Sequence, residues 1–196
     1  MIAPGATIGV LGGGQLGRMF ALAAARLGYR VHVFAPEADN PTEQVCAAAT
    51  HAAYDDLAAL KAFAAGCDAV TYEFENVPVA AAEAIAATTP VHPAPDWLRV
   101  AQDRRREKAF VQAAGAAVAT YPTIQGEADL AAPDLPLPGI LKTAQSGYDG
   151  KGQMRVAEAA ALPAAWKSLG RVPCVLEAVV PFEREISVIV ARGADG

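Results

Sequence analysis

The strongest candidate for phosphate binding is a polar loop that follows an apolar strand. Lys142 ends the apolar stretch that begins at Gly139, and a loop with three glycines comes next. These glycines are Gly147, Gly150 and Gly152. Backbone N–H groups of such a loop can surround phosphate oxygens while a lysine supplies positive charge. Asp149-Gly150 is also a common hairpin turn, but the lysine on the preceding strand favours phosphate binding. The spacing is not that of a Walker loop.

A second glycine-rich motif, Gly12-Gly13-Gly14-Gln15-Leu16-Gly17, fits G-x-G-x-x-G between a strand and a helix. A dinucleotide site also needs an acid near the end of the second strand. Glu37 nearly satisfies this spacing, but Pro36 occupies the strand end where the ribose contact should form. We therefore rank NAD below another phosphate or polar ligand. Tight packing of the helix on the sheet is the structural alternative.

Carboxylates follow other apolar stretches. Glu73, Glu75 and Asn76 come directly after residues 69–72. If they lie at the carboxyl edge of a parallel sheet, they would face a ligand. The alternative, which we weight equally, is that they are acidic residues at the start of a helix, where the helix dipole favours negative charge. Later in the chain, a carboxylate at Glu185 could accept hydrogen bonds from ribose hydroxyls, or could simply be an exposed charge at the start of a strand.

The first half of the chain must position these groups through alternating strands and helices. The periodicity predicts short strands at 6–13, 31–34, 69–72 and 91–93. It predicts helices at 15–28, 55–66 and 80–87. Such alternation is typical of a parallel sheet with right-handed crossovers. We expect a Rossmann-like domain over residues 1–97.

The pattern changes after residue 96. Residues 96–114 are predicted to form one charged helix. We interpret its basic cluster around Arg104 mainly as a solvent-exposed helix face, from which one residue could still contact phosphate. Residues 126–138 are a surface excursion, and strands are predicted at 139–143, 153–156, 174–180 and 185–192. Two strands joined by a glycine loop form a hairpin. We expect an α+β domain over residues 98–196.

Composition narrows the classes of protein. The 196 residues are 53% hydrophobic and 19% charged, which is globular rather than disordered composition. The net charge of -5 argues against a nucleic-acid partner. Three cysteines without CxxC spacing exclude a disulfide scaffold and a cysteine zinc site, and fit the cytoplasm. We expect no membrane span. A turn signal directly after the last predicted strand suggests a sequence that is cut short.

Five motifs, taken in order, resemble those of the ATP-grasp ligases of purine biosynthesis, in particular the members that carboxylate aminoimidazole ribonucleotide. The resemblance covers nearly the whole chain. It is carried by the runs 12–19, 71–77, 102–108, 141–153 and 177–187. It implies a Rossmann-like pre-ATP-grasp domain followed by the first part of an ATP-grasp α+β domain. The run Tyr72 to Val77 and the pair Tyr148-Asp149 separate this member from the related formate-dependent transformylase.

The resemblance implies roles for individual residues. ATP would be bound by the following residues: Arg104, Lys142, Gly147, Tyr148, Asp149, Gly150, Lys151, Gly152, Gln153, Glu177, Ala178, Val179, Val180 and Glu185. In this set Glu177 through Val180 would form the adenine edge. The substrate nucleotide would contact Gln15, Leu16, Glu73 and Tyr148. Asp149 and Lys151 would be catalytic.

The implied reaction joins bicarbonate to 5-aminoimidazole ribonucleotide with ATP and Mg²⁺, through carboxyphosphate. The implied partners are these small molecules, and a homodimer is also compatible. No metal ligand is expected within residues 1–196, since the family's Asn and Glu ligands would lie in a later subdomain. This chain alone is therefore expected to be inactive. The alternatives are another ATP-grasp ligase such as glycinamide ribonucleotide transformylase, an NAD(P)-dependent oxidoreductase, and a non-catalytic nucleotide-binding module.

Overall fold

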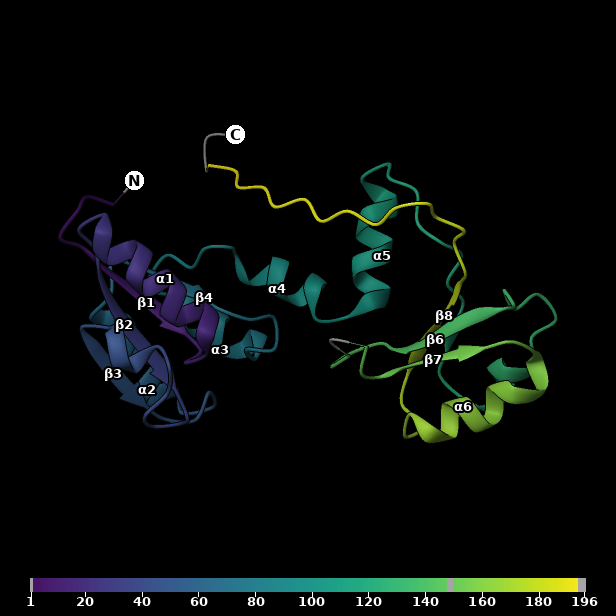
Figure 1. Cartoon of the computed structure of the whole chain (residues 1–196). Coiled ribbons are helices and arrows are strands. Elements are labelled where there is room, and N and C mark those ends of the chain that lie inside the picture. The colour runs from purple at the N-terminus through teal and green to yellow at the C-terminus, as the bar shows by residue number, and fades with distance from the viewer. Residues whose placement is uncertain (1, 148–149, 194–196) are drawn as a thin grey trace. The chain divides into compact units, whose positions relative to one another are not determined.

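The computed structural model describes residues 2–147 and 150–193, which divide into two compact units (Figure 1). Unit 1 comprises residues 1–116 and unit 2 residues 117–196. This division differs from the expected one after residue 97, because the helices that follow residue 94 belong to unit 1. Among the helices of the described residues, none combines the length and apolar character needed to cross a membrane.

Unit 1 is built on a parallel sheet, as the alternating pattern predicts. Its strands are β1 (Thr7–Leu11), β2 (Arg30–Ala35), β3 (Ala48–His51) and β4 (Ala69–Tyr72). Their order is β3-β2-β1-β4, and each neighbouring pair is parallel. Val91 adds a single parallel bridge to Val70, where a short strand is predicted. Strand β3 was not predicted from the sequence.

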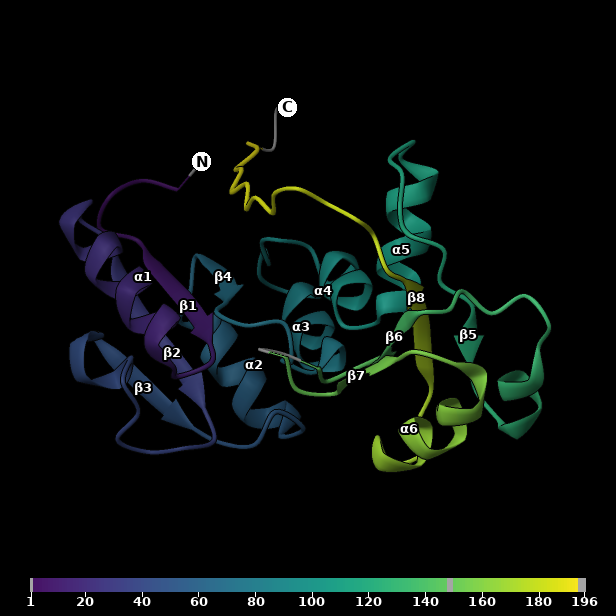
Figure 2. The ribbon, with the colours of Figure 1, turned by 45° about the vertical axis from the view of Figure 1, so that its right-hand side comes forward.

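Helices cover both faces of this sheet, so its strands are apolar on both sides. Helix α1 (Gln15–Arg26) packs on one face, where Val10 and Val31 contact Ala21 and Ala24. Helices α2 (Leu57–Ala65) and α3 (Val79–Ala86) cover the other face and share a larger core with the sheet (Figure 2). The buried residues of that core include Leu11, Phe34, Leu60, Phe63 and Ile85. A short 3-10 helix, η1 (Glu43–Val45), follows β2.

The single helix predicted over 96–114 is wrong, because the structure has two helices there. Helix α4 (Pro95–Ala101) ends at Gln102, and α5 (Arg104–Ala113) begins after Asp103. Asp103 has an extended backbone, and its carboxylate accepts a hydrogen bond from the Arg105 N–H. An aspartate in this position starts a new helix rather than continuing the old one.

Unit 2 contains an antiparallel sheet in the order β5-β8-β6-β7. Its strands are β5 (Thr123–Ile124), β6 (Gly139–Thr143), β7 (Gln153–Val156) and β8 (Cys174–Ala178). The predicted hairpin is confirmed, since β6 and β7 pair directly with Lys142 opposite Gln153. Helix α6 (Leu162–Ser168), which was not predicted, packs Trp166 against Leu141 and Leu176 in the core. The 3-10 helices η2 (Glu127–Ala131) and η3 (Ala159–Ala161) complete the described elements.

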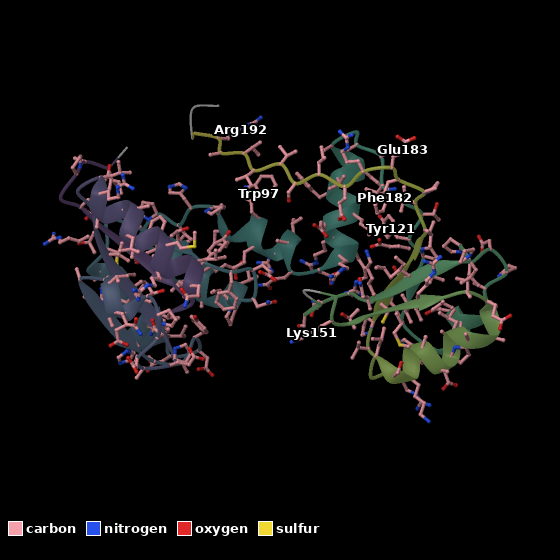
Figure 3. The ribbon with its side chains drawn as sticks, in the orientation of Figure 1. Trp97, Tyr121, Lys151, Phe182, Glu183 and Arg192 are labelled. Carbon is pink, nitrogen blue, oxygen red and sulfur yellow. The ribbon has the colours of Figure 1, made fainter. Side chains whose placement is uncertain are left out.

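The strand predicted over residues 185–192 is not found. Within the described part of the chain, residues after 178 form no strand and run as an extended, exposed segment that carries Phe182, Glu183 and Arg192 (Figure 3). The side chain of Ile189 is 98% exposed. A strand needs a neighbour to accept and donate its backbone hydrogen bonds, and alternation of apolar residues cannot supply that neighbour.

Candidate functional site

The glycine-rich turn of unit 1 holds a carboxylate from the same chain. Strands β1 and β4 are neighbours with Leu11 opposite Tyr72, so Glu73 lies beside the turn. Its Oε1 accepts a hydrogen bond of 2.5 Å from the Gly14 N–H, and its Oε2 accepts one of 2.6 Å from the Gly17 N–H. Helix α1 has no acidic residue in its first turn and no side-chain cap. Glu73 therefore supplies the negative charge that a helix N-terminus favours.

The glycines of the motif make room for this carboxylate. A Cβ atom added at Gly12 would lie 2.5 Å from Cγ of Glu73, and one at Gly14 would lie 2.7 Å from its Oε1. Gly12 also has φ +109°, which side chains other than glycine rarely adopt. In a dinucleotide site the pyrophosphate takes this position. In this structure the position is filled by Glu73, which argues against the NAD interpretation.

A buried turn after β2 braces the glycine motif from the other side. Thr42 is fully buried, and its hydroxyl donates to the Gly14 carbonyl at 2.9 Å. Asn40 is 6% exposed; its side chain donates to the Glu37 carbonyl at 2.9 Å and accepts from the Glu43 N–H at 2.9 Å. Sequence reasoning missed both residues. The run Asn40-Pro41-Thr42 is a turn signal, but its contact with the glycines depends on how β2 and β1 pair.

Three of the four predicted substrate residues lie at this turn, and the fourth, Tyr148, is outside the described residues. Gln15 and Leu16 form the exposed first positions of α1, and Leu16 is 61% exposed. Glu73 lies next to them and is partly buried. Tyr54 packs against Phe34 of β2 with ring centroids 5.8 Å apart. Burial, together with the charges of Glu37 and Glu73, raises the pKa of its phenol to about 12. The structure thus brings three of the predicted residues together.

The loop that carries Glu73 is also held at its far end. The Gln102 Nε2 donates to the carbonyl of Glu75 at 2.7 Å and to the carbonyl of Val77 at 2.6 Å. The side chains of Glu75 and Asn76 are exposed, and the Asn76 amide donates to the Glu75 carboxylate at 3.3 Å. Gln102 is the first residue of the run 102–108, which is one of the five that carry the family resemblance, but the sequence did not indicate a role for it.

In unit 2, two of the candidate ATP contacts form an ion pair. Lys142 Nζ lies 2.7 Å from Oε2 of Glu177, and the side chains are 23% and 12% exposed. The register of β6 and β8 explains the pair, because Ile140 is opposite Glu177 and Lys142 is two residues further along β6. Leu141, between them, points into the core, so Lys142 lies on the opposite face of the sheet. This face presents a lysine and a carboxylate together.

The glycine loop follows β6, which ends at Thr143, one residue after this lysine. Thr143 N–H donates to the Gly152 carbonyl at 2.8 Å, which closes the hairpin. Gly150 and Gly152 have φ of +77° and +70°, so the loop requires glycine at both positions. Lys151 is exposed at the end of the hairpin (Figure 3). The predicted contacts Tyr148 and Asp149 lie outside the described residues.

The remaining predicted ATP residues are distributed over both units. Ala178 ends β8, and Val179 and Val180 follow it directly. Glu185 is exposed in the extended segment, where it stays a prediction. Arg104 is the first residue of α5 and belongs to unit 1, whereas Lys142 belongs to unit 2. Over residues 2–147 and 150–193, no three His, Cys, Asp or Glu side chains gather as a metal-binding group.

Comparison with known proteins identifies two domain families in the chain. Residues 5–102 match the model of the ribonucleotide synthetase preATP-grasp domain, and residues 109–196 match the model of the ATP-grasp domain. The two matches bracket the helix break at Gln102–Asp103 and agree with the fold class that the sequence predicts.

Individual relatives match along nearly the whole chain. An N5-carboxyaminoimidazole ribonucleotide synthase of Brucella melitensis is 47% identical over 98% of this chain and 54% of its own length. A crystal structure of an N5-carboxyaminoimidazole ribonucleotide synthetase with ADP has a TM-score of 0.87 at 41% identity, covering 93% of this chain and 49% of that one. An Aspergillus clavatus N5-carboxyaminoimidazole synthase with ADP and 5-aminoimidazole ribonucleotide has a TM-score of 0.80 at 29% identity, over 91% and 47%. The chain spans about half the length of the relatives it matches.

Proposed function

Because the chain belongs to the ribonucleotide synthetase preATP-grasp family and carries an ATP-grasp domain behind that domain, we propose that it contributes to an N5-carboxyaminoimidazole ribonucleotide synthetase. Such an enzyme joins bicarbonate to the exocyclic amine of 5-aminoimidazole ribonucleotide and converts ATP to ADP and phosphate. Relatives that match along nearly the whole chain have this name. The protein would act on small molecules, and its three free cysteines fit a reducing cytoplasm.

The observation that carries this proposal is the carboxylate of Glu73 on the glycine turn. It argues against a nicotinamide dinucleotide at that turn and so supports the face of unit 2 that carries Lys142 and Glu177 as the proposed nucleotide site. Unit 1 then serves the second substrate. Gln15, Leu16 and Glu73 would contact the ribonucleotide at the carboxyl edge of the sheet, where open α/β sheets bind ligands.

In unit 2 the chemistry is phosphoryl transfer, which depends on positioning and charge neutralisation. Lys142 would exchange part of its contact with Glu177 for phosphate oxygens of ATP, and Arg104 would add a second positive charge. The loop through Gly150 and Gly152 would cover the phosphates with backbone N–H groups. Glu177 to Val180 would line the adenine, and Glu185 would accept hydrogen bonds from ribose hydroxyls.

Carboxylation follows from the phosphate transfer. Bicarbonate oxygen attacks the γ-phosphorus, ADP leaves, and carboxyphosphate forms. The amine of the ribonucleotide then attacks the carboxyl carbon, or the CO₂ released from it, and phosphate departs while the amine loses a proton. Asp149 is proposed to accept this proton, and Lys151 to stabilise the anionic carboxyl group. Tyr148 would face the imidazole ring.

Over the part of the chain that the structure describes, no three His, Cys, Asp or Glu side chains form a group that would hold Mg²⁺. When bound, the ion supplies charge neutralisation between the phosphates. Lys142, Lys151 and Arg104 would add positive charge from the side chains.

The test is a coupled assay of the complete gene product that carries this sequence. ADP release should require 5-aminoimidazole ribonucleotide and bicarbonate together, and the carboxylated nucleotide should form in step with ADP. Formate with glycinamide ribonucleotide, the substrates of the related transformylase, serves as the control pair. ADP release with that pair and none with the first would overturn the proposal.

A further inference from the structure

The contacts of Gln102 single it out among the residues that the proposed chemistry does not use. One side-chain nitrogen bridges the carbonyls of Glu75 and Val77 at 2.7 and 2.6 Å. A primary amide has two N–H donors, so both bonds can form at once. Val77 is fully buried and directly precedes Pro78, the residue before α3. Gln102 therefore fixes the point where the loop enters the core of unit 1.

The loop from Glu73 to Val77 is thereby attached at two places. At its start the Glu73 N–H donates to the Leu11 carbonyl at 3.1 Å, and the Glu73 carboxylate accepts from the glycine turn. At its end it is held by Gln102 from the end of α4. A loop fixed at both ends has few conformations, so release of either end allows Glu73 and the exposed pair Glu75-Asn76 to move.

The residues next to Gln102 are held independently of it. Asp103 is 3% exposed, and its carboxylate accepts from the Arg105 N–H at 3.0 Å and from Nε of the same residue at 2.9 Å. These bonds set the start of α5 and so the place of Arg104. Loss of the Gln102 amide should therefore disturb the loop of Glu73 while Arg104 keeps its position.

We propose that Gln102 is a positioning residue for the ribonucleotide substrate, which acts by holding the Glu73–Val77 loop against the glycine turn. This inference rests on the proposed function, since it takes the edge around Glu73 as the ribonucleotide site. It assigns to Gln102 an effect on the ribonucleotide that is separate from any effect on ATP. A misplacement of about 1 Å at such a loop can cost up to about 100-fold in activity.

The test compares Gln102→Glu with Arg99→Gln in the complete gene product. Gln102→Glu keeps the shape of the side chain but places oxygen against two carbonyl oxygens in place of donors. Arg99 lies three residues earlier on α4 and pairs on the surface with Glu83 of α3 and with Asp96, and both of these partners are outside the loop. Both variants remove a contact of α4, and only the first removes the hydrogen bonds to the loop. The measurements are the KM for each substrate, kcat and the melting temperature.

We expect Gln102→Glu to raise the KM for 5-aminoimidazole ribonucleotide about tenfold, with the KM for ATP changed by less than about threefold. Amide exchange in residues 74–77 should accelerate in the same variant. Arg99→Gln should leave both KM values unchanged. A lowered melting temperature with an unchanged ribonucleotide KM, or equal rises of both KM values, would overturn the role of Gln102. A wild-type protein with no ribonucleotide-dependent ADP release would overturn the proposed function itself.

Discussion

Replacement of Glu73 by glutamine tests the central contact of unit 1. Glutamine has nearly the same shape but offers one oxygen and an N–H₂ group in place of two charged oxygens. One of the two amides at the start of α1, that of Gly14 or Gly17, would then face a donor in place of an acceptor. The other would keep a hydrogen bond to a neutral oxygen. The negative charge at the helix N-terminus would also be lost.

The size of the effect follows from these three losses. Hydrogen bonds to charged groups contribute about 1.5–3 kcal/mol each, and a charge at a helix N-terminus about 0.3–1 kcal/mol. Glu73→Gln loses one such bond and the charge term, and weakens the second bond. We therefore expect unit 1 to be destabilised by about 2–4 kcal/mol. Glu75→Gln is the matched control, since its exposed carboxylate contacts only the Asn76 side chain among the hydrogen bonds described.

The assay is urea unfolding followed through Trp97, which lies on α4 of unit 1. Trp166 belongs to unit 2 and is changed to Phe in all variants, so that the fluorescence reports one unit. Because Glu73 is partly buried, the loss should persist in 0.5 M NaCl, where contributions of exposed charges are screened. A Glu73→Gln variant within about 0.5 kcal/mol of the parent, or equal to Glu75→Gln, would refute this reasoning.

Three further outcomes are expected. Lys142→Ala should raise the KM for ATP by about tenfold or more. The control, Lys61→Ala on the exposed side of α2, should change this KM by less than about twofold. Equal effects of the two variants would show that Lys142 does not bind phosphate. Asp149→Asn should lower kcat by about 10²–10⁴ with an unchanged melting temperature, because Asn-Gly forms the same turn; wild-type turnover would reduce Asp149 to a turn residue. Burial raises the pKa of the Cys67 thiol from 9.0 to about 11, so the folded state retains a proton that the unfolded state loses in that range. The free energy of unfolding should therefore fall as the pH rises from 9 to about 11. In a variant with the other two cysteines changed to serine, the Cys67 thiol should react with a thiol reagent at about pH 8 about 100-fold more slowly in the folded than in the unfolded protein. Comparable rates in the two states would contradict this.

The sequence predicted the elements whose signals are local. The glycines at 12–17 and the apolar stretch 69–72 each mark an element by their own composition, and the structure confirms both. The hairpin of β6 and β7 was equally predictable, because its two strands are joined by a short loop. The helix break at Asp103 was missed although its signal is also local, since an aspartate before a helical run is a typical N-cap.

The contacts that build the site depend on strand order, which no local pattern contains. Glu73 meets Gly14 and Gly17 only because β4 pairs with β1, and 59 residues separate Gly14 from Glu73. The pair of Lys142 and Glu177 likewise depends on β6 lying next to β8. Motif reading named all these residues as candidates. It could not show that Glu73 binds the glycine turn of its own chain.

The Glu73 carboxylate on the glycine turn also matters for the redesign of this fold and for the assignment of function from sequence motifs. To convert this scaffold into a dinucleotide-binding protein, the first change would be deletion of the Glu73 side chain, because the glycines and the helix N-terminus are already in place. A search for G-x-G-x-x-G alone would assign such chains to the oxidoreductases. A pattern that also examines the residue after the neighbouring strand would separate turns that receive a cofactor from turns that carry their own anion.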